Sequence, residues 1–172
     1  MNSVMILLRL IHIVCGVFWA GALIFIATFL EPSVRAVGPE GGRVMLAIIR
    51  RRYLDIMPAI ALLTILSGLT MMWKLSGGFN PEWMRSRYAM TLSLGASSAL
   101  LAFIIGVFFM RPAALRLFRL APSVAQMQDG PAKDAQQAEL AVLRARIGVL
   151  GRWVAGFLAL AVCAMAVARY IS

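Results

Sequence analysis

The stretch RLIHIVCGVFWAGALIF, residues 9–25, decides the fold class because it is long and almost entirely apolar. Its apolar character extends on both sides and covers residues 4–30. A helix of about 20 apolar residues is long enough to cross the hydrocarbon core of a membrane. The stretch also contains His12, the only histidine in the chain. An ionisable side chain inside such a segment is costly, so it is a candidate for function.

The composition of the whole chain also favours a membrane protein. The 172 residues are 62% hydrophobic with a mean hydropathy of +0.86, whereas soluble domains average about 45–50% apolar residues. This length predicts a single membrane domain, residues 1–172, with no second soluble domain. The net charge of +10 lies mainly at the ends of apolar runs. Because no basic groove interleaved with aromatic residues is present, we expect no nucleic-acid partner and take the lipid bilayer as the main one.

Four apolar runs are long enough to span a bilayer. They cover residues 4–30, 53–73, 88–110 and 147–168. None alternates like a strand of a β-barrel, so the sequence predicts an all-α, polytopic four-helix bundle. We expect Glu31-Pro32 to end the first run, Arg111-Pro112 to end the third and Pro58 to kink the second.

The distribution of Lys and Arg predicts the orientation of the bundle. Eleven lie in the first and third connections between runs, and five lie in the second connection and the terminal segments. Cytoplasmic loops of membrane proteins carry the excess of basic residues. We therefore expect both termini outside, which in a bacterium means the periplasmic side of the inner membrane.

The connection between the third and fourth runs is long enough to have a structure of its own. Residues 113–120 continue the third helix, whereas residues 121–133 are rich in turn-forming residues. Asp134 is expected to cap a helix over residues 135–146. Helices three and four are therefore predicted to extend into the cytoplasm as an antiparallel hairpin over residues 113–146.

Local signals predict three further features. Gly38-Pro39-Glu40 indicates that the second helix begins near Pro39. Asp55 is expected to pair with an arginine of the first or third connection, and Arg152 is a candidate at a similar depth. Small residues four apart predict one packing face on each of three helices: Gly16 and Ala20, then Ser98, Ala102 and Gly106, then Gly151, Ala155, Ala159 and Cys163.

His12 is the first candidate for chemistry. On a helix, Arg9, His12, Gly16 and Trp19 share one face. Such a face would hold a flat macrocycle if Gly16 leaves space, His12 ligates iron and Arg9 reaches a propionate. The alternative is a neutral histidine that is hydrogen-bonded to a neighbouring helix.

The methionines suggest a copper site as a second possibility. The chain has 11 of them, and those expected near the outward side are Met1, Met5, Met71, Met72, Met84 and Met90. Thioether, thiolate and imidazole ligands together suit Cu(I). A site for copper handling or transport would therefore use His12, Cys15, Met71 and Met72. Methionine is also a common core residue, so packing alone explains many of these positions.

The connection between the second and third runs, which we expect to lie outside, carries further charged and aromatic residues. Trp83 and Tyr88 suit an aromatic belt at the membrane interface. Arg85 and Arg87 would pair with Glu82, or with an anionic ligand that faces His12. The sequence has no second histidine, no Ser/His/Asp set and no phosphate-binding glycine loop, which argues against hydrolytic chemistry.

The segment LIHIVCGVFWAGALIFIATFLEPSVR, residues 10–35, resembles the first helix of the CopD-like membrane proteins. Ile11-His12, Trp19-Ala20-Gly21 and Pro32 to Arg35 match the pattern in order. The segment LLTILSGLTMMW, residues 62–73, is similar to the second helix of that group. The segment EWMRSRYAM, residues 82–90, resembles the HemJ-type protoporphyrinogen oxidases, with Arg87 at the position of a lysine.

The resemblance implies a b-type haem held by His12, with Arg9, Gly16, Trp19 and Arg87 around it, and a role in membrane redox or porphyrin chemistry. With one histidine per chain, bis-histidine ligation needs a homodimer. Otherwise a methionine, Cys15 or water supplies the sixth ligand. A structural accessory subunit of a larger membrane complex is the third possibility.

Overall fold

The structure is a computed structural model that describes residues 3–171, and no β-strand occurs among them. Its helices, in chain order, are α1 (Ser3–Phe25), η1 (Ile26–Leu30), α2 (Glu31–Val37), α3 (Pro39–Arg50), α4 (Tyr53–Leu75), α5 (Pro81–Met84), α6 (Arg87–Ile104), η2 (Ile105–Met110), α7 (Arg111–Gln126) and α8 (Pro131–Ala168). The two η segments are π-helical and lie inside longer continuous helices.

Four helical stretches in the described chain are long and apolar enough to cross a membrane. They are Ser3–Val37, Tyr53–Leu75, Arg87–Gln126 and Pro131–Ala168. Large apolar side chains on them face outward, including Val17 at 68% and Phe108 at 65% exposure. Such a surface is costly in water and suits lipid. The predicted all-α architecture with four spans is confirmed, and it is consistent with a multi-pass membrane protein.

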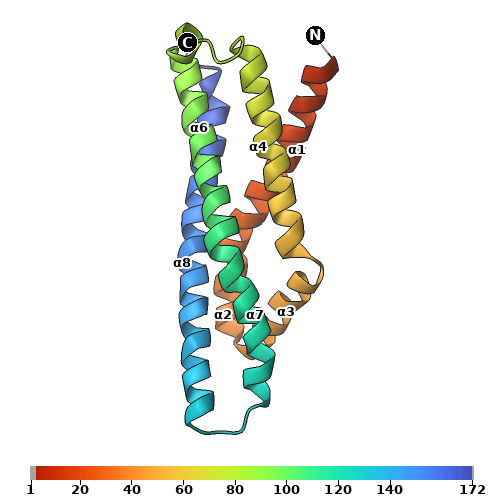
Figure 1. Cartoon of the computed structure of the whole chain (residues 1–172), viewed down its shortest axis with the longest axis vertical. Coiled ribbons are helices and arrows are strands. Elements are labelled where there is room, and N and C mark those ends of the chain that lie inside the picture. The colour runs from red at the N-terminus through yellow and green to blue at the C-terminus, as the bar shows by residue number, and fades with distance from the viewer. Residues whose placement is uncertain (1–2, 172) are drawn as a thin grey trace.

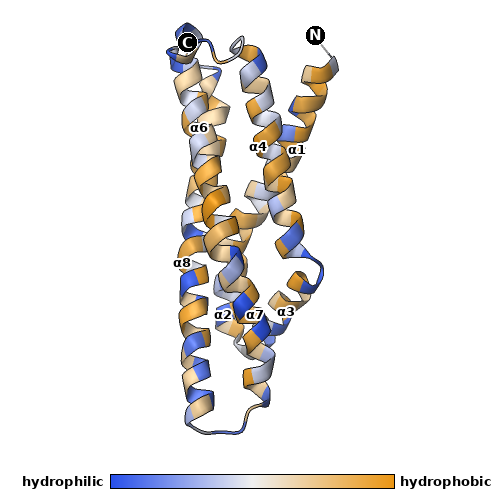
Figure 2. Ribbon diagram, viewed as in Figure 1, coloured by the Kyte–Doolittle hydropathy of each residue, from blue (hydrophilic) through white to orange (hydrophobic). Residues whose placement is uncertain are grey.

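The bundle has two distinct ends (Figure 1). Both described chain ends and α5 lie at one of them, which we call the terminal end. The opposite end, which we call the hairpin end, is formed by α2, α3, α7 and the first part of α8 (Figure 1). Figure 2 shows apolar residues along the spans and more hydrophilic residues towards the hairpin end.

The helices of the first and third spans both continue past their prolines. This continuation is contrary to prediction for Pro32, whereas the continuation of the third helix beyond Pro112 was predicted. In each, a π-helical turn comes directly before the residue that precedes proline. The Glu31 amide donates to the carbonyl of Ile26, and the Arg111 amide donates to the carbonyl of Gly106. A proline ring clashes with the carbonyl four residues earlier in an α-helix and has no N–H to donate. The wider π turn makes room for the ring, so the helix continues into α2 or α7.

A helix begins at Pro39 as predicted, but it is the separate helix α3, and the second span begins only at Tyr53. Arg52 has φ 61° and ψ 24°, a left-handed conformation that changes the chain direction between α3 and α4. On the other side of the hairpin end, α7 runs to Gln126 and α8 begins at Pro131. The predicted turn over residues 121–133 is thus too long. The N-cap of α8 is Gly130 and not Asp134. Proline suits the first helical position, because the N–H that it lacks would have no partner within the helix there.

The antiparallel pair formed by α7 and the first part of α8 has a small core of its own. Its buried residues are Ala113, Leu117, Val124, Leu140 and Leu143. Arg116 and Glu139 form an ion pair across the two helices at 2.5 Å. At the tip, the hydrogen bond and charge of Lys133 lower the pKa of the Asp129 carboxyl below its usual value.

All four spans meet in one core cluster, formed by Trp19, Ala20, Leu23, Ala61, Ala99, Ala102, Val154, Leu158 and Ala161. Most of these residues are small, which lets the helices approach closely. The predicted small-residue face of the fourth span is wrong, because Ala159 and Cys163 are exposed. Its buried face instead contains Val154, Leu158 and Ala161. Within the bundle, α1 packs mainly on α4, and α6 packs mainly on α8.

Candidate functional site

His12 lies in the seam between α1 and α4, and its side chain is half-buried. Its Nδ1 atom is 2.8 Å from the backbone carbonyl oxygen of Thr64. A carbonyl oxygen can only accept, so Nδ1 carries the proton that forms this bond. In the neutral imidazole, the lone pair is therefore on Nε2. The bond fixes both the tautomer and the orientation of the ring.

Two glycines allow this close approach of α1 and α4. An ideal Cβ atom on Gly68 would lie 2.7 Å from His12 Cε1 and 3.0 Å from His12 Nδ1. One turn further along α1, an ideal Cβ on Gly16 would lie 3.3 Å from Thr64 Cγ2. The imidazole thus occupies the space that a side chain at position 68 would take. Gly16, which was predicted to leave space, does so for Thr64.

The carbonyl of Thr64 belongs to a small polar group inside the apolar span. Ser67 Oγ is 3.0 Å from this carbonyl and 2.6 Å from the carbonyl of Leu63. The side chains of Thr64 and Ser67 are both buried. Thr64, Ser67 and Gly68 were not predicted as site residues. The only available signal was the short polar and small sequence Ser67-Gly68 within an apolar run.

The other residues predicted around a haem are not all brought together. Arg9 lies one turn from His12 towards the terminal end and is exposed. Arg87 is the first residue of α6 and is also exposed. Trp19 is only 4% exposed and belongs to the core cluster, about 10 Å further along α1 by helical rise. The structure therefore places Trp19 in the packing of the four spans.

The predicted copper ligands are not gathered at one depth of the seam. Cys15 is half-buried one turn from His12 towards the hairpin end, whereas Met71 and Met72 lie one turn from Gly68 towards the terminal end, because α1 and α4 run in opposite directions. Within residues 3–171, no three His, Cys, Asp or Glu side chains come together as a metal site. A metal here would therefore need methionine, water or a cofactor among its ligands. Met1 lies outside the described residues.

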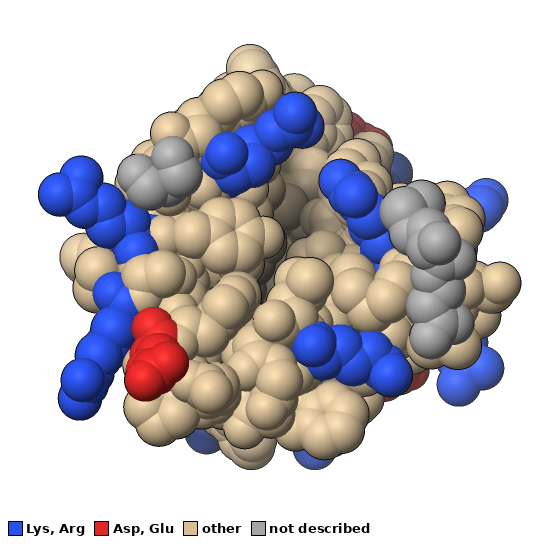
Figure 3. All heavy atoms as spheres, turned by 90° about the horizontal axis from the view of Figure 1, so that it is seen from above, with Lys and Arg blue, Asp and Glu red and all other residues tan. Residues whose placement is uncertain are grey.

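The terminal end is hollowed at its centre, and basic side chains surround the hollow (Figure 3). The basic residues in the segments that form this end are Arg9, Lys74, Arg85, Arg87 and Arg169. Within the described part of the chain, none of them forms an ion pair, so Arg85 and Arg87 do not pair with Glu82. Trp83 and Tyr88 form an edge-to-face pair with ring centroids 5.9 Å apart. This end thus presents an excess of unpaired positive charge.

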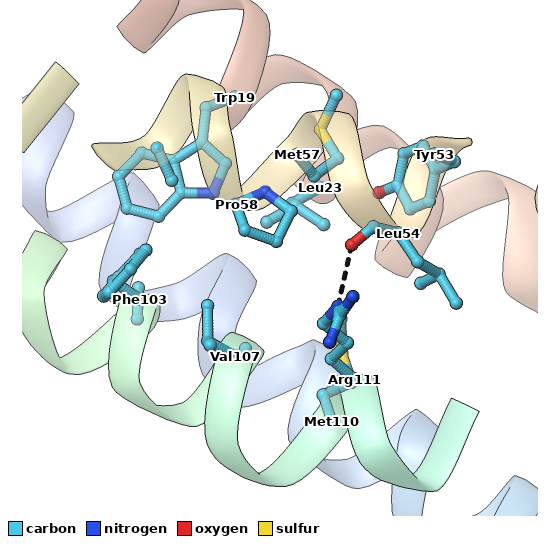
Figure 4. A pocket seen from close by; sticks show the side chains of 13 residues that line it. Trp19, Leu23, Tyr53, Leu54, Met57, Pro58, Phe103, Val107, Met110 and Arg111 are labelled. Atoms are coloured by element: carbon cyan, nitrogen blue, oxygen red, sulfur yellow. Dashed lines mark hydrogen bonds between the residues drawn. The ribbon is translucent and has the colours of Figure 1, made fainter. Parts of the chain in front are cut away.

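A second hollow, towards the hairpin end, is small and apolar (Figure 4). It has a volume of about 40 Å³ and is bordered by Trp19, Tyr53, Pro58, Val107 and Met110 among others. The Tyr53 hydroxyl is buried without a hydrogen-bond partner in the described structure. Ligand sites for small molecules usually occupy about 300–1,000 Å³. This pocket is therefore too small for a porphyrin.

Arg111 lines this pocket and forms an ion pair with Asp55. Its Nε donates to the carbonyl of Leu54 at 2.9 Å, and its NH2 group lies 2.8 Å from Asp55 Oδ1. The predicted pairing of Asp55 with an arginine of the third connection is confirmed. Arg152 is not the partner. The arrangement links α4 to α7 at the boundary between span and hairpin end.

No family model matches the chain, and neither a curated protein nor a solved structure matches it. The resemblance to CopD-like and HemJ-type proteins therefore stays a prediction from the residues quoted above.

Proposed function

We propose that this protein binds a b-type haem in the membrane, with His12 Nε2 as an axial ligand, and serves membrane redox or porphyrin chemistry. The observation that carries this proposal is the hydrogen bond from His12 Nδ1 to the carbonyl of Thr64. Histidines that ligate metals generally donate their other ring N–H to a carbonyl or carboxylate, which orients the ring and raises its basicity. His12 has this arrangement, with its Nε2 lone pair available to iron.

The charge of the terminal end supports the same proposal. Haem carries two propionates, and Arg9 and Arg87 lie at this end without acidic partners among the described residues. The haem would lie between His12 and this basic surface, where Figure 3 shows the hollow. A methionine such as Met71, Cys15, water or His12 of a second copy would complete the coordination. Trp19 has a packing role in this proposal.

The orientation follows from the same charges. The hairpin end carries most of the basic residues, so we assign it to the cytoplasm and the terminal end to the periplasm of a bacterial inner membrane. Haem would then lie close to the periplasmic surface.

Copper binding is the second candidate, favoured by the position of Met71 and Met72. Both lie one helical turn beyond Gly68, the residue against which the imidazole packs. Sulfur ligands from methionine suit Cu(I). In this alternative, His12, Cys15 and the methionines bind copper ions directly.

We expect the detergent-purified protein from haem-replete cells to show a Soret band and, after dithionite reduction, sharp α bands. His12→Gln should lose these bands and still fold, because glutamine can donate to the Thr64 carbonyl but cannot ligate haem. Ser97→Ala, an exposed change on α6, is the matched control and should keep the spectrum. Metal analysis of the same samples distinguishes iron from copper.

Three results would overturn the haem proposal. The first is an unchanged spectrum in His12→Gln, which would exclude His12 as the ligand. The second is a flat spectrum with copper retained by the parent protein and lost in the variant, which would support the copper alternative. The third is a protein with neither metal that copurifies with stoichiometric partners, which would indicate an accessory subunit.

A further inference from the structure

The helix α3 and the corner that follows it form a separate feature at the hairpin end. On a helical projection, Arg43 and Arg50 fall on one face of α3, and Met45, Ile48 and Ile49 fall on the opposite face. Glu40 and Val44 lie one turn apart at the border between the two faces. This separation of charged and apolar residues is typical of a helix that lies in a membrane interface. Neither the predicted haem site nor the core of the bundle uses this helix.

We propose that α3 and the Arg50–Arg52 corner bind the head groups of anionic phospholipids in the leaflet at the hairpin end. From the length of α4, we expect the corner to lie near the depth of the lipid phosphates. The next helix, α4, begins at Tyr53 and has 23 residues, which gives a length of about 34 Å. The hydrocarbon core is about 30 Å thick, so the first turn of α4 and the preceding arginines lie at its boundary.

The corner has more positive charge than its acidic neighbours can neutralise. Asp55 is held by Arg111 at 2.8 Å, and the Nε of Arg52 is 4.0 Å from the same carboxylate. Within residues 3–171, Arg50 and Arg51 form no ion pair. Lipid phosphates near such a cluster are attracted by about 1 kcal/mol for each basic residue, a value that falls with salt. The unpaired guanidinium groups are therefore complementary to anionic head groups.

The apolar face of α3 explains why the partner is a lipid and not a soluble anion. Val44, at the border of this face, is 52% exposed, and Ile48 and Ile49 are only half-buried. The helix packs on α2 and touches α4 near the corner. An ideal Cβ on Gly41 would meet the backbone of Val34, so α2 and α3 are in backbone contact. This contact holds α3 in place while part of its apolar face remains open to acyl chains.

The test uses the full-length protein in mild detergent, titrated with phosphatidylglycerol or phosphatidylethanolamine and followed by native mass spectrometry. In the double variant Arg50→Gln/Arg51→Gln, we expect the affinity for phosphatidylglycerol to fall by roughly tenfold or more. Binding of phosphatidylethanolamine should change little. The control is Arg119→Gln/Lys133→Gln, which removes the same charge from the α7–α8 hairpin beyond the spans and should bind phosphatidylglycerol within about twofold of the parent.

Two results would overturn the proposal. If both double variants lose affinity equally, the head groups respond to the overall charge of the protein. If neither variant loses affinity, the head groups bind elsewhere. If inorganic phosphate at equal concentration displaces phosphatidylglycerol, the corner is a site for a soluble anion. Thermal unfolding of the three proteins must agree within a few degrees. We expect this agreement because Arg50, Arg51 and Arg119 are exposed, and because Lys133 pairs only with Asp129, a 96% exposed carboxylate at the hairpin tip.

Discussion

Gly68→Ala is expected to lower the stability of the protein and to displace the ring of His12. The added Cβ would lie 2.7 Å from His12 Cε1, much closer than two carbon atoms can pack. Alanine is intrinsically better than glycine in a helix by up to about 1 kcal/mol, so the substitution would stabilise α4 if space were available. Overpacking typically costs about 1–3 kcal/mol, and loss of the His12–Thr64 hydrogen bond costs about 1 kcal/mol more. We expect a net loss of about 1–2 kcal/mol.

Gly21→Ala is the matched control, because an ideal Cβ on Gly21 has no neighbour within 4 Å. This variant should be as stable as the parent or slightly more stable. Thermal unfolding in detergent compares the two. In the double variant His12→Ala/Gly68→Ala the clash is absent. Its loss of stability should therefore be smaller than the sum of the losses in the two single variants. If Gly68→Ala were as stable as Gly21→Ala, the imidazole would not lie against Gly68.

The variant Gly68→Ala also tests the packing of His12 separately from its proposed role as a haem ligand. The loss of stability depends only on the contact between α1 and α4. A weakened or shifted Soret band, in contrast, requires that His12 ligates haem and that its orientation matters. If Gly68→Ala is destabilised but keeps the Soret band of the parent, or if the parent itself is colourless, the result would support the seam and contradict the haem proposal.

The all-α class and the number of long apolar helices could be predicted from the sequence because membrane spans leave a strong signal of length and hydropathy. The helix ends were less predictable. Pro32 and Pro112 usually indicate a helix end, but a π turn before each one accommodates the ring. Conversely, the left-handed residue that separates α3 from the second span is Arg52, a residue type that does not mark such a position. These local geometries depend on neighbouring turns and on packing.

The candidate site was predictable only in part. His12 stands out as the single histidine in an apolar run. Its partner is a backbone carbonyl of another helix, and no residue type identifies such a partner in advance. The fourth span shows a related difficulty, since several overlapping rows of small residues fit a four-residue spacing. Only the packed structure shows that the row with Val154 and Leu158 is buried, whereas Ala159 and Cys163 are exposed.

The largest loss of stability is expected for Gly95→Leu, because Gly95 is buried in the contact between α6 and α8. An ideal Cβ there would lie 3.0 Å from Met165 Cγ, 3.2 Å from the carbonyl oxygen of Ala161 and 3.4 Å from Ala164 Cβ. The methionine side chain can move, but the Ala161 carbonyl moves only with the helix. A leucine must therefore push α8 away from α6 along the most extensive helix contact of the bundle. We expect a cost of about 3 kcal/mol.

Gly156→Leu provides the comparison, since an ideal Cβ on Gly156 meets nothing within 4 Å and the residue is exposed on α8. In detergent this variant should unfold close to the parent protein, while Gly95→Leu unfolds well below it. Gly95→Ala should lie between them, because its contacts of 3.0–3.4 Å require shifts of only a few tenths of an ångström. Equal stability of the two leucine variants would mean that α6 and α8 are further apart at this depth. A graded loss from alanine to leucine at position 95 would instead show that the backbone contact sets the spacing of this helix pair.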